Sequence, residues 1–127
     1  MGTYSQIVAL YLQALHASDL ATILSPFAKD ATVHSPFLGK KKPETFFKKV
    51  FNSSAKSDIT VYDILESARG ERRAVGYFHY SWALRDGTRV DFDCADVFEF
   101  DRAGKIASLI ILYDTYPFRE RVGDKVS

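Results

Sequence analysis

The sequence contains only one cysteine, Cys94, among its 127 residues. A single cysteine excludes an internal disulfide bond and any zinc site built from several cysteines. An excess of one charge sign is also missing, because 17 lysines and arginines are matched by 16 aspartates and glutamates, and the net charge is +1. The chain therefore lacks the positive field that would recruit nucleic acid or an anionic membrane. We expect no nucleic-acid partner.

Long apolar runs are absent as well. No stretch is long enough to span a bilayer, and the first residues lack the apolar core of a signal peptide. We therefore expect no membrane partner and a cytoplasmic location. The sequence also contains no glycine-rich phosphate loop, His–Glu metal spacing, nucleophile elbow or calcium loop. Since the histidines and aspartates are scattered, we predict no metal site and no cofactor.

Aromatic residues, in contrast, are abundant, with ten Phe, seven Tyr and one Trp. At this length we expect one domain over residues 1–127, in which residues 118–127 form a loose polar tail. Such a domain buries about two thirds of the surface of its unfolded chain. The aromatic residues can supply that core, and they also suit a cavity that receives a flat apolar ligand.

The spacing of apolar residues predicts helices followed by strands. Helices are predicted over residues 3–17, 20–27 and 43–51, with a short strand at 31–35. Four β-rich segments follow, at residues 59–67, 73–84, 89–101 and 105–116. Two of the links between them are short turns that contain Gly87 and Gly104, as in antiparallel hairpins. This order predicts an α+β fold, in which a curved antiparallel sheet wraps around the N-terminal helices.

Asp96 is the most unusual residue of the predicted strands. Alternate side chains of a strand point the same way, and the others on the side of Asp96 are all apolar: Val90, Phe92, Cys94, Phe98 and Phe100. A buried carboxylate without a partner is costly, so the group either finds one or keeps its proton. A protonated aspartic acid in an apolar cavity donates a hydrogen bond and can stabilise an oxyanion. A kink in the strand, or a cap on a backbone amine, is the alternative.

Two further residues are candidates for the same site. Tyr11 lies on the apolar side of the first helix, and its phenol needs a partner if it is buried. Near Asp96 it would complete a site with two donors, although a tyrosine in this position also suits the core. His34 is the ionisable candidate for a base near neutral pH. Alternation places Val33 and Ser35 on one side of the strand and His34 on the other, unless the strand ends early.

The opposite side of the second long strand carries Tyr77, His79 and Ser81. A sheet with one uncovered face needs a partner, and tyrosine is enriched in protein interfaces. We therefore expect a homodimer through this outer face, with His79 as a structural or interface residue. The lysine cluster at residues 40–42 and 48–49 is interpreted as a solvated surface, with an anion site as the alternative.

Four segments, at residues 11–20, 27–36, 95–106 and 112–115, together resemble the nuclear-transport-factor-2-like superfamily. The resemblance is to its SnoaL-like and ketosteroid-isomerase-like branch. It implies a cystatin-like, cone-shaped α+β barrel closed by helices, with a pocket at its open end and frequent homodimers. The fold hosts isomerases, cyclases, hydrolases, dehydratases and plain binding modules, so the resemblance specifies the fold more closely than the activity.

The resemblance also assigns roles to single residues. The helix tyrosine of the ketosteroid isomerases matches Tyr11, and their protonated aspartic acid matches Asp96. Their proton-shuttling aspartate aligns with Ser35, and a serine cannot abstract a proton from carbon at useful rates without a neighbouring base. In SnoaL-like cyclases and related epoxide hydrolases, an acidic residue near the end of the last strand moves the proton. Asp114 is the nearest match, although alternation turns it outward unless the strand bulges.

The resemblance and the apolar pattern together predict an apolar pocket. Its expected lining is Leu15, Phe27, Val33, Ser35, Phe78, Tyr80, Trp82, Phe98, Leu109, Ile111 and Tyr113. One hypothesis is an isomerase, cyclase or hydratase that works by acid–base chemistry without a cofactor. Its ligand would be a small hydrophobic carbonyl compound, polyketide-like or steroid-like. The alternative is a non-catalytic module of the same fold that binds a ligand or forms dimers.

Overall fold

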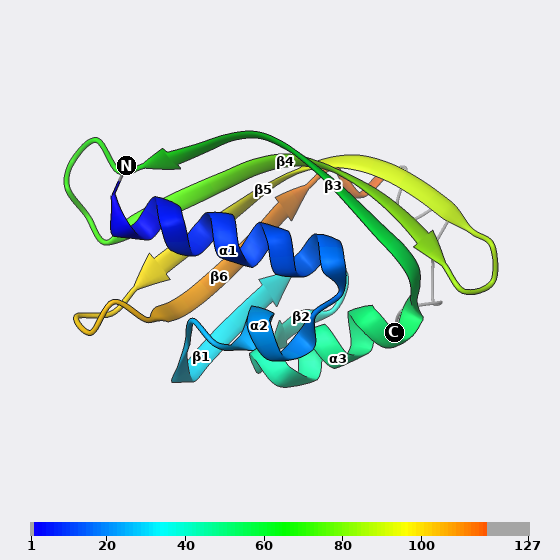
Figure 1. The fold of residues 1–127 in the computed structure, drawn as a ribbon, viewed down its shortest axis with the longest axis horizontal. Coiled ribbons are helices and arrows are strands. Elements are labelled where there is room, and N and C mark those ends of the chain that lie inside the picture. The colour runs from blue at the N-terminus through cyan, green and yellow to red at the C-terminus, as the bar shows by residue number, and fades with distance from the viewer. Residues whose placement is uncertain (1, 117–127) are drawn as a thin grey trace.

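A computed structural model describes residues 2–116, and the polar tail predicted for residues 118–127 lies outside this range. The helices lie on one side of a curved six-stranded sheet, and α1 crosses its concave face (Figure 1). The helices are α1 (Thr3–Ala17), α2 (Leu20–Leu24) and α3 (Pro43–Ser53). The strands are β1 (Phe27–Ser35), β2 (Gly39–Lys41), β3 (Ser54–Glu66), β4 (Arg73–Leu84), β5 (Arg89–Phe100) and β6 (Ile106–Tyr113).

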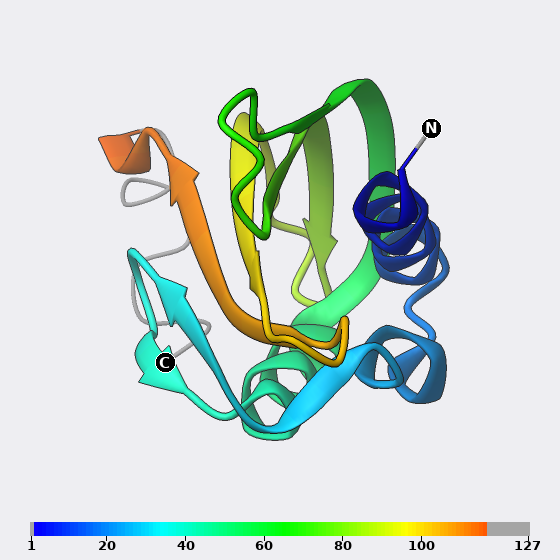
Figure 2. The same ribbon diagram turned by 90° about the vertical axis from the view of Figure 1, so that its left-hand side faces the viewer.

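The strand order of the sheet is β2-β1-β6-β5-β4-β3. β3 to β6 form a meander in which each strand is antiparallel to the next, and the predicted turns at Gly87 and Gly104 connect β4 to β5 and β5 to β6. β1, by contrast, pairs in parallel with β6. Figure 2 shows the sheet curling around the helices. The predicted α+β fold, with a curved sheet wrapped around N-terminal helices, is confirmed.

The start of the sheet differs from the prediction. α2 ends at Leu24 instead of continuing to residue 27, because the chain becomes extended where it meets β6. Phe27 lies opposite Ile106, whose N–H donates to the Pro26 carbonyl at 2.9 Å. β1 consequently begins at Phe27 and not at residue 31. β2 was not predicted, since its sequence Gly-Lys-Lys has no apolar pattern, yet it pairs antiparallel with the end of β1.

α1 packs on the sheet where β4 carries its smallest inward-facing residues, Ala74 and Gly76. Val8 and Leu12, one turn apart on α1, come close to Gly76. A Cβ atom at Gly76 would lie 3.0 Å from Val8 Cγ1 and 3.3 Å from Leu12 Cδ1. Tyr11 belongs to the same buried side of α1. Gly76 therefore sets how closely the part of α1 that carries Tyr11 approaches the sheet.

Side-chain hydrogen bonds connect both ends of α1 to the edge strand β3. At the first turn, Ser5 donates its N–H (2.9 Å) and its hydroxyl (2.6 Å) to the Glu66 carboxylate. At the last turn, His16 Nδ1 accepts the Ile59 N–H at 3.0 Å. The second bond satisfies an edge amide that would otherwise be available to pair with another chain. These hydrogen bonds thus fix α1 against β3 and cover part of the sheet edge.

Candidate functional site

A cavity of about 60 Å³ lies between the concave face of the sheet and helices α1 and α3. Its lining includes Tyr11, Asp96 and seven other residues expected from the sequence: Leu15, Ser35, Phe78, Tyr80, Trp82, Ile111 and Tyr113. It also includes seven that were not expected: Phe37, Leu38, Phe46, Phe47, Val50, Phe92 and Cys94. The walls are thus mainly aromatic and aliphatic, and Asp96 is the only carboxyl group among them.

Four residues expected in the pocket do not line the cavity. Val33, Phe98 and Leu109 are fully buried elsewhere in the core. Phe27 is half-buried, and its ring packs against the rings of Tyr11 and Phe47. The inward direction was predicted correctly for these side chains, but α1 and α2 cover this end of the sheet, so they contribute to packing. The expected pocket lining was wrong at these positions.

Tyr11 and Asp96 meet inside the protein. The Tyr11 hydroxyl donates to Asp96 Oδ2 at 3.1 Å, and each residue is only 1% exposed. The second carboxyl oxygen, Asp96 Oδ1, is the one buried side-chain oxygen or nitrogen in residues 2–116 that has no hydrogen-bond partner. A buried polar atom of this kind is rare in proteins and calls for a ligand or a role in chemistry. The pair therefore presents one open hydrogen-bonding position.

Burial controls the ionisation of this pair. Loss of solvation raises the pKa of Asp96 to about 7, while the hydrogen bond from Tyr11 acts in the opposite direction. The pKa of Tyr11 is raised well above its usual value, first by burial and then by the neighbouring Asp96 charge. Near neutral pH, Asp96 thus exists in both protonation states. Because Oδ2 accepts from Tyr11, the proton of the neutral acid belongs on Oδ1.

Two other polar side chains in the cavity wall have partners in the core. The Tyr80 hydroxyl lies 2.9 Å from Ser57 Oγ, and the Trp82 indole N–H donates to Ser54 Oγ at 2.6 Å. The Ser54 hydroxyl in turn donates to the Val50 carbonyl. These bonds orient the two rings, so Tyr80 and Trp82 act as shaped walls. They leave Asp96 as the distinctive polar group of the cavity.

Ser35 has a structural role at the rim of the cavity. Its hydroxyl oxygen accepts the backbone N–H groups of Phe37 and Leu38, both at 3.3 Å. These bonds shape the turn that brings both side chains into the cavity wall. Burial raises the pKa of Tyr113, and the Ser35 hydroxyl partly opposes that rise. Ser35 supplies turn geometry at the position where related isomerases carry an aspartate.

His34 and Asp114, the candidates for proton transfer, lie away from the Tyr11–Asp96 pair. His34 pairs with Ile110 on the outer side of the sheet, and its Nε2 is 3.4 Å from Thr32 Oγ1. Asp114 follows the end of β6, is exposed, and accepts the Tyr116 N–H at 3.0 Å. Neither residue lines the cavity. The outward direction expected from alternation therefore holds for both, and no bulge turns Asp114 inward.

The remaining candidates lie on the surface or in the wall. Cys94 is buried in the cavity wall, and desolvation raises the pKa of its thiol, which fits an inert apolar role. His79 lies on the outer face between two carboxylates, with Nδ1 2.9 Å from Asp93 and Nε2 3.3 Å from Asp91. The Asp93 hydrogen bond is the main cause that raises the pKa of His79.

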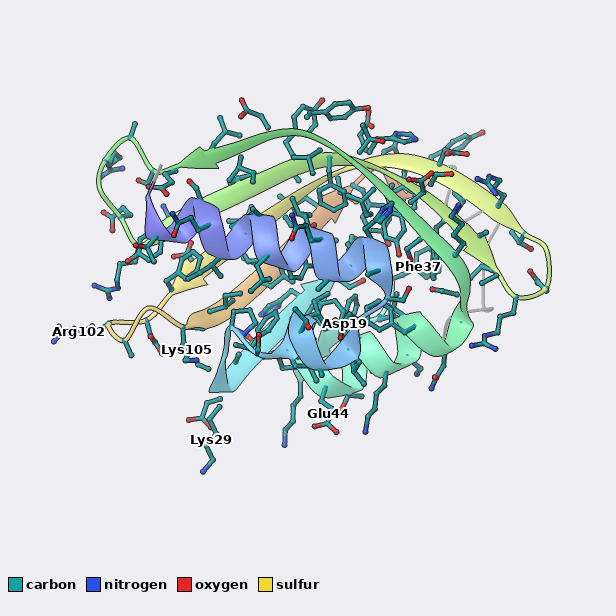
Figure 3. All side chains as sticks on the ribbon, in the orientation of Figure 1. Asp19, Lys29, Phe37, Glu44, Arg102 and Lys105 are labelled. Atoms are coloured by element: carbon teal, nitrogen blue, oxygen red, sulfur yellow. The ribbon has the colours of Figure 1, made fainter. Side chains whose placement is uncertain are left out.

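The lysine cluster includes a solvated helix face. Lys48 pairs with Glu44 one turn away on α3 at 2.8 Å, and Figure 3 shows Glu44 pointing away from the body of the protein. Among residues 2–116, no group of three or more histidine, cysteine, aspartate or glutamate side chains could hold a metal ion. No helix within the same range is long and apolar enough to cross a membrane.

A curved sheet, closed by helices over an apolar cavity, defines a nuclear-transport-factor-2-like α+β protein. The sequence profile of the SnoaL-like domain matches residues 8–109, and the chain belongs to this family. The resemblance stated from the sequence is therefore confirmed. A comparison with curated proteins finds no match.

Solved structures agree with this assignment. An NTF2-like protein of unknown function from Burkholderia pseudomallei is similar with a TM-score of 0.81 at 20% identity, over 97% of this chain and 99% of that one. SalBIII, an epoxide hydrolase/cyclase-like enzyme in pyran ring formation of the polyether salinomycin, is similar with a TM-score of 0.75 at 20% identity. The match covers 90% of this chain and 92% of that one. Bal32a, from a soil-derived mobile gene cassette, is similar with a TM-score of 0.78 at 23% identity, over 93% of this chain and 95% of that one. At these identities the likeness establishes the fold alone.

Proposed function

We propose that the cavity binds a small, largely apolar molecule through a single oxygen atom. The observation that carries this proposal is Asp96 Oδ1, an unpartnered buried oxygen in a cavity with mainly apolar walls. When Asp96 is protonated, Oδ1 donates a hydrogen bond to the oxygen of the ligand, and Tyr11 holds Oδ2 in place. A carbonyl oxygen is the natural partner, because it accepts and needs no acceptor in return.

This arrangement also supports acid catalysis. Negative charge that develops on a bound oxygen would be stabilised by the Asp96 proton in a site that excludes most water. SalBIII, a structural relative, is described as epoxide hydrolase/cyclase-like, and opening an epoxide also places charge on oxygen. An isomerase or cyclase reaction of this kind needs no cofactor. We propose Asp96 as its general acid and Tyr11 as the residue that orients the acid.

Cavity size restricts the ligand. A volume of about 60 Å³ is smaller than the roughly 150 Å³ of an engineered protein cavity that holds benzene. We propose that only the oxygen-bearing end of a ligand lies beside Asp96 and that the rest extends toward the half-buried lining residues Phe37 and Leu38. A compact ketone or a narrow terminal group therefore suits the site better than a fused steroid or polyketide ring system.

A non-catalytic binding module is the second candidate. The observation that favours it is that the lining residues within 2–116 include no separate base, since Ser35 fixes a turn and His34 does not line the cavity. Abstraction of a proton from carbon requires an ionised or neutral base within hydrogen-bond reach of the substrate. Asp96 would have to serve as both acid and base, or the protein only binds its ligand.

We also propose that the protein forms a homodimer through the outer face of the sheet. Four large apolar residues on this face are strongly exposed: Tyr62, Leu65, Tyr77 and Leu112. The Tyr62 and Tyr77 rings lie 4.8 Å apart, and the Tyr62 hydroxyl donates to Asp93 at 2.9 Å. Large exposed apolar patches mark interaction sites in proteins.

A cytoplasmic location remains a proposal from the sequence.

Cyclohex-2-enone is a suitable probe, because it is neutral and its strong π→π* absorption band shifts to longer wavelength when the carbonyl accepts a strong hydrogen bond. At pH 6 we expect this shift in the wild type and in the control Asp30→Asn, which removes an exposed carboxylate of β1. Asp96→Leu should lose it, because leucine has no group that can donate a hydrogen bond to the carbonyl oxygen. Equal binding to both variants would contradict the site. Exchange of the ring protons with deuterated water that requires Asp96 would support catalysis, and binding without exchange would favour the module.

A further inference from the structure

Among residues 2–116, the cavity lining contains one group that can become charged negatively near neutral pH and none that can become positive. Asp96 is the only acid among the sixteen lining residues, and they include no lysine, arginine or histidine. Nine of the sixteen are aromatic, so most of the wall consists of ring surfaces. An ionised Asp96 in this setting would have no counter-charge of its own. A positively charged ligand could supply it.

The rings form a continuous wall across the sheet. From β4 to β6, the Trp82 and Tyr80 centroids lie 5.9 Å apart, those of Tyr80 and Phe92 5.3 Å, and those of Phe92 and Tyr113 4.8 Å. The faces of aromatic rings carry negative partial charge and attract cations within about 6 Å. Aromatic walls of this kind recognise alkylated ammonium groups, whose methyl groups also pack well against rings. The wall therefore complements an organic cation.

The hydrogen bonds of Asp96 specify how many N–H groups such a cation should carry. Oδ2 already accepts from Tyr11, whereas Oδ1 has no partner in residues 2–116. A tertiary ammonium group has one N–H, which Oδ1 can accept. A primary ammonium group has three, and the surplus donors would face apolar walls. Each buried donor without an acceptor weakens binding by roughly 5- to 100-fold. The site thus favours a tertiary amine.

The other titratable groups around Asp96 do not compete for the ligand charge. They are Tyr11 of α1, Tyr80 of β4, Cys94 of β5 and Tyr113 of β6. Burial raises the pKa of each of them, so all four remain neutral at and below neutral pH. α3 and the turn between β1 and β2 contribute no ionisable side chain to the lining. Within the described part of the chain, Asp96 is therefore the one charged partner that the lining offers to a cation.

We propose that this cavity is also a binding site for small tertiary amines, held as ammonium ions between the Asp96 carboxylate and the surrounding aromatic rings. The proton that the neutral acid carries on Oδ1 is replaced by the N–H of the ligand. The cavity thus takes an oxygen acceptor when Asp96 is protonated and an organic cation when Asp96 is ionised. This inference shares the cavity with the proposed function but does not depend on oxygen binding or on catalysis.

The test uses trimethylamine, with its isomer propylamine as a primary-amine control, in isothermal titrations of the wild-type protein from pH 5 to pH 8. Below the pKa of Asp96, affinity for the tertiary amine should rise toward tenfold per pH unit, because binding displaces one proton. It should then level off. Propylamine should bind at least fivefold more weakly. Cyclohex-2-enone should show the opposite dependence on pH, so failure of either ligand can be recognised separately.

Two variants complete the test. Asp96→Asn should weaken binding of the tertiary amine by at least tenfold at pH 8, whereas the exposed control Asp30→Asn should leave it unchanged. If Asp96→Asn fails to fold, the Asp96 carboxyl carbon can be followed by NMR in the wild type at pH 6. Saturation with the amine should move its signal to the ionised position. Affinity that is independent of pH, or an NMR signal that does not move, would overturn the proposal.

Discussion

Among individual side chains, Asp96 has the largest effect on the properties of this protein. A neutral carboxyl group is tolerated inside an apolar cavity. The ionised form is much less stable there, because it loses its hydration and has no opposite charge beside it. The rise of the Asp96 pKa to about 7 expresses that difference. The same side chain therefore connects ligand binding with stability, and both can be measured through its titration.

Replacing Asp96 with Asn should make stability less dependent on pH. The folded state holds the Asp96 proton up to about pH 7, whereas the unfolded chain releases it near pH 4. Between these values the folded state binds more protons, so the wild type loses stability as pH rises, by up to about 4 kcal/mol. In urea denaturation from pH 4 to pH 8, the free energy of unfolding of Asp96→Asn should increase relative to that of the wild type up to pH 7. A difference that does not change with pH would contradict this.

Removing the Tyr11 hydroxyl should raise the pKa of Asp96 further. Tyr11 donates to Oδ2 and favours the ionised form, so Tyr11→Phe takes away the interaction that opposes burial. Titration of the Asp96 carboxyl carbon by NMR should give a midpoint above that of the wild type. Tyr80→Phe is a matched control, since its hydroxyl bonds to Ser57 and not to Asp96. A wild-type midpoint near 4 would mean that Asp96 is solvated.

Sequence patterns predicted these two residues well. Alternation along β5 identified Asp96 as an inward carboxyl, and the apolar side of the first helix identified Tyr11. Alternation also indicated that His34 and Asp114 point outward, and the structure places them there. The unsatisfied Oδ1 could not be predicted, because a missing hydrogen bond depends on the positions of every neighbour in space.

At the level of helices and strands, Gly76 connects packing with the site. Val8 and Leu12 touch the space where a side chain at Gly76 would lie, and the β-branched Val8 has little rotamer freedom in a helix. Gly76 also pairs directly with Asp96 on the neighbouring strand. A Cβ atom at Gly76 would therefore require Val8 and Leu12, or α1 with them, to move by a few tenths of an ångström beside the Tyr11–Asp96 hydrogen bond.

We expect Gly76→Ala to destabilise the protein by about 1–3 kcal/mol, the usual range for an overpacked core. It should also raise the pKa of Asp96, because the Tyr11 bond of 3.1 Å is already long for two oxygens and would lengthen further. Adding Val8→Ala should make room for the new methyl group and restore the pKa. The measurements are chemical denaturation and NMR titration of Asp96.

The outcome in a Tyr11→Phe background provides the control for this prediction. Gly76→Ala should then leave the pKa of Asp96 where Tyr11→Phe puts it, since no Tyr11 hydrogen bond remains to be lost. If Gly76→Ala in the wild-type background lowers stability but leaves the pKa of Asp96 unchanged, Gly76 affects packing alone and not the Tyr11–Asp96 hydrogen bond.

The cavity walls supplied by other elements were harder to predict. Periodicity predicted α3 and its apolar side, yet nothing in the sequence indicated that Phe46, Phe47 and Val50 would face the same cavity as Asp96. Helix position depends on tertiary packing, whereas strand alternation is local. β2 was missed for a related reason, because its pairing with β1 is made by the backbone and leaves no mark in its lysine-rich sequence.

For the molecule as a unit, the uncovered outer face of the sheet predicts self-association. Light scattering at micromolar concentration should give about twice the chain mass of 14.3 kDa. Tyr77→Lys places a charge in the middle of the apolar face and should yield the monomer mass. Leu10→Lys is the matched control, because Leu10 is a similarly exposed apolar residue on α1, away from that face. A monomer mass for the wild type would refute the dimer.

The parallel pairing of β1 with β6 affects how the chain folds. β3 to β6 are neighbours in sequence as well as in the sheet, so their contacts form by closing short loops. Phe27 meets Ile106 only after a loop of about 80 residues has closed, and such closure slows folding. Pulse-labelled hydrogen exchange should therefore protect the amides of β4 and β5 before those of β1. Since Ser35, Phe37 and Leu38 arrive with β1 and the turn after it, the ligand cavity would be completed only late in folding, after most of its wall has formed.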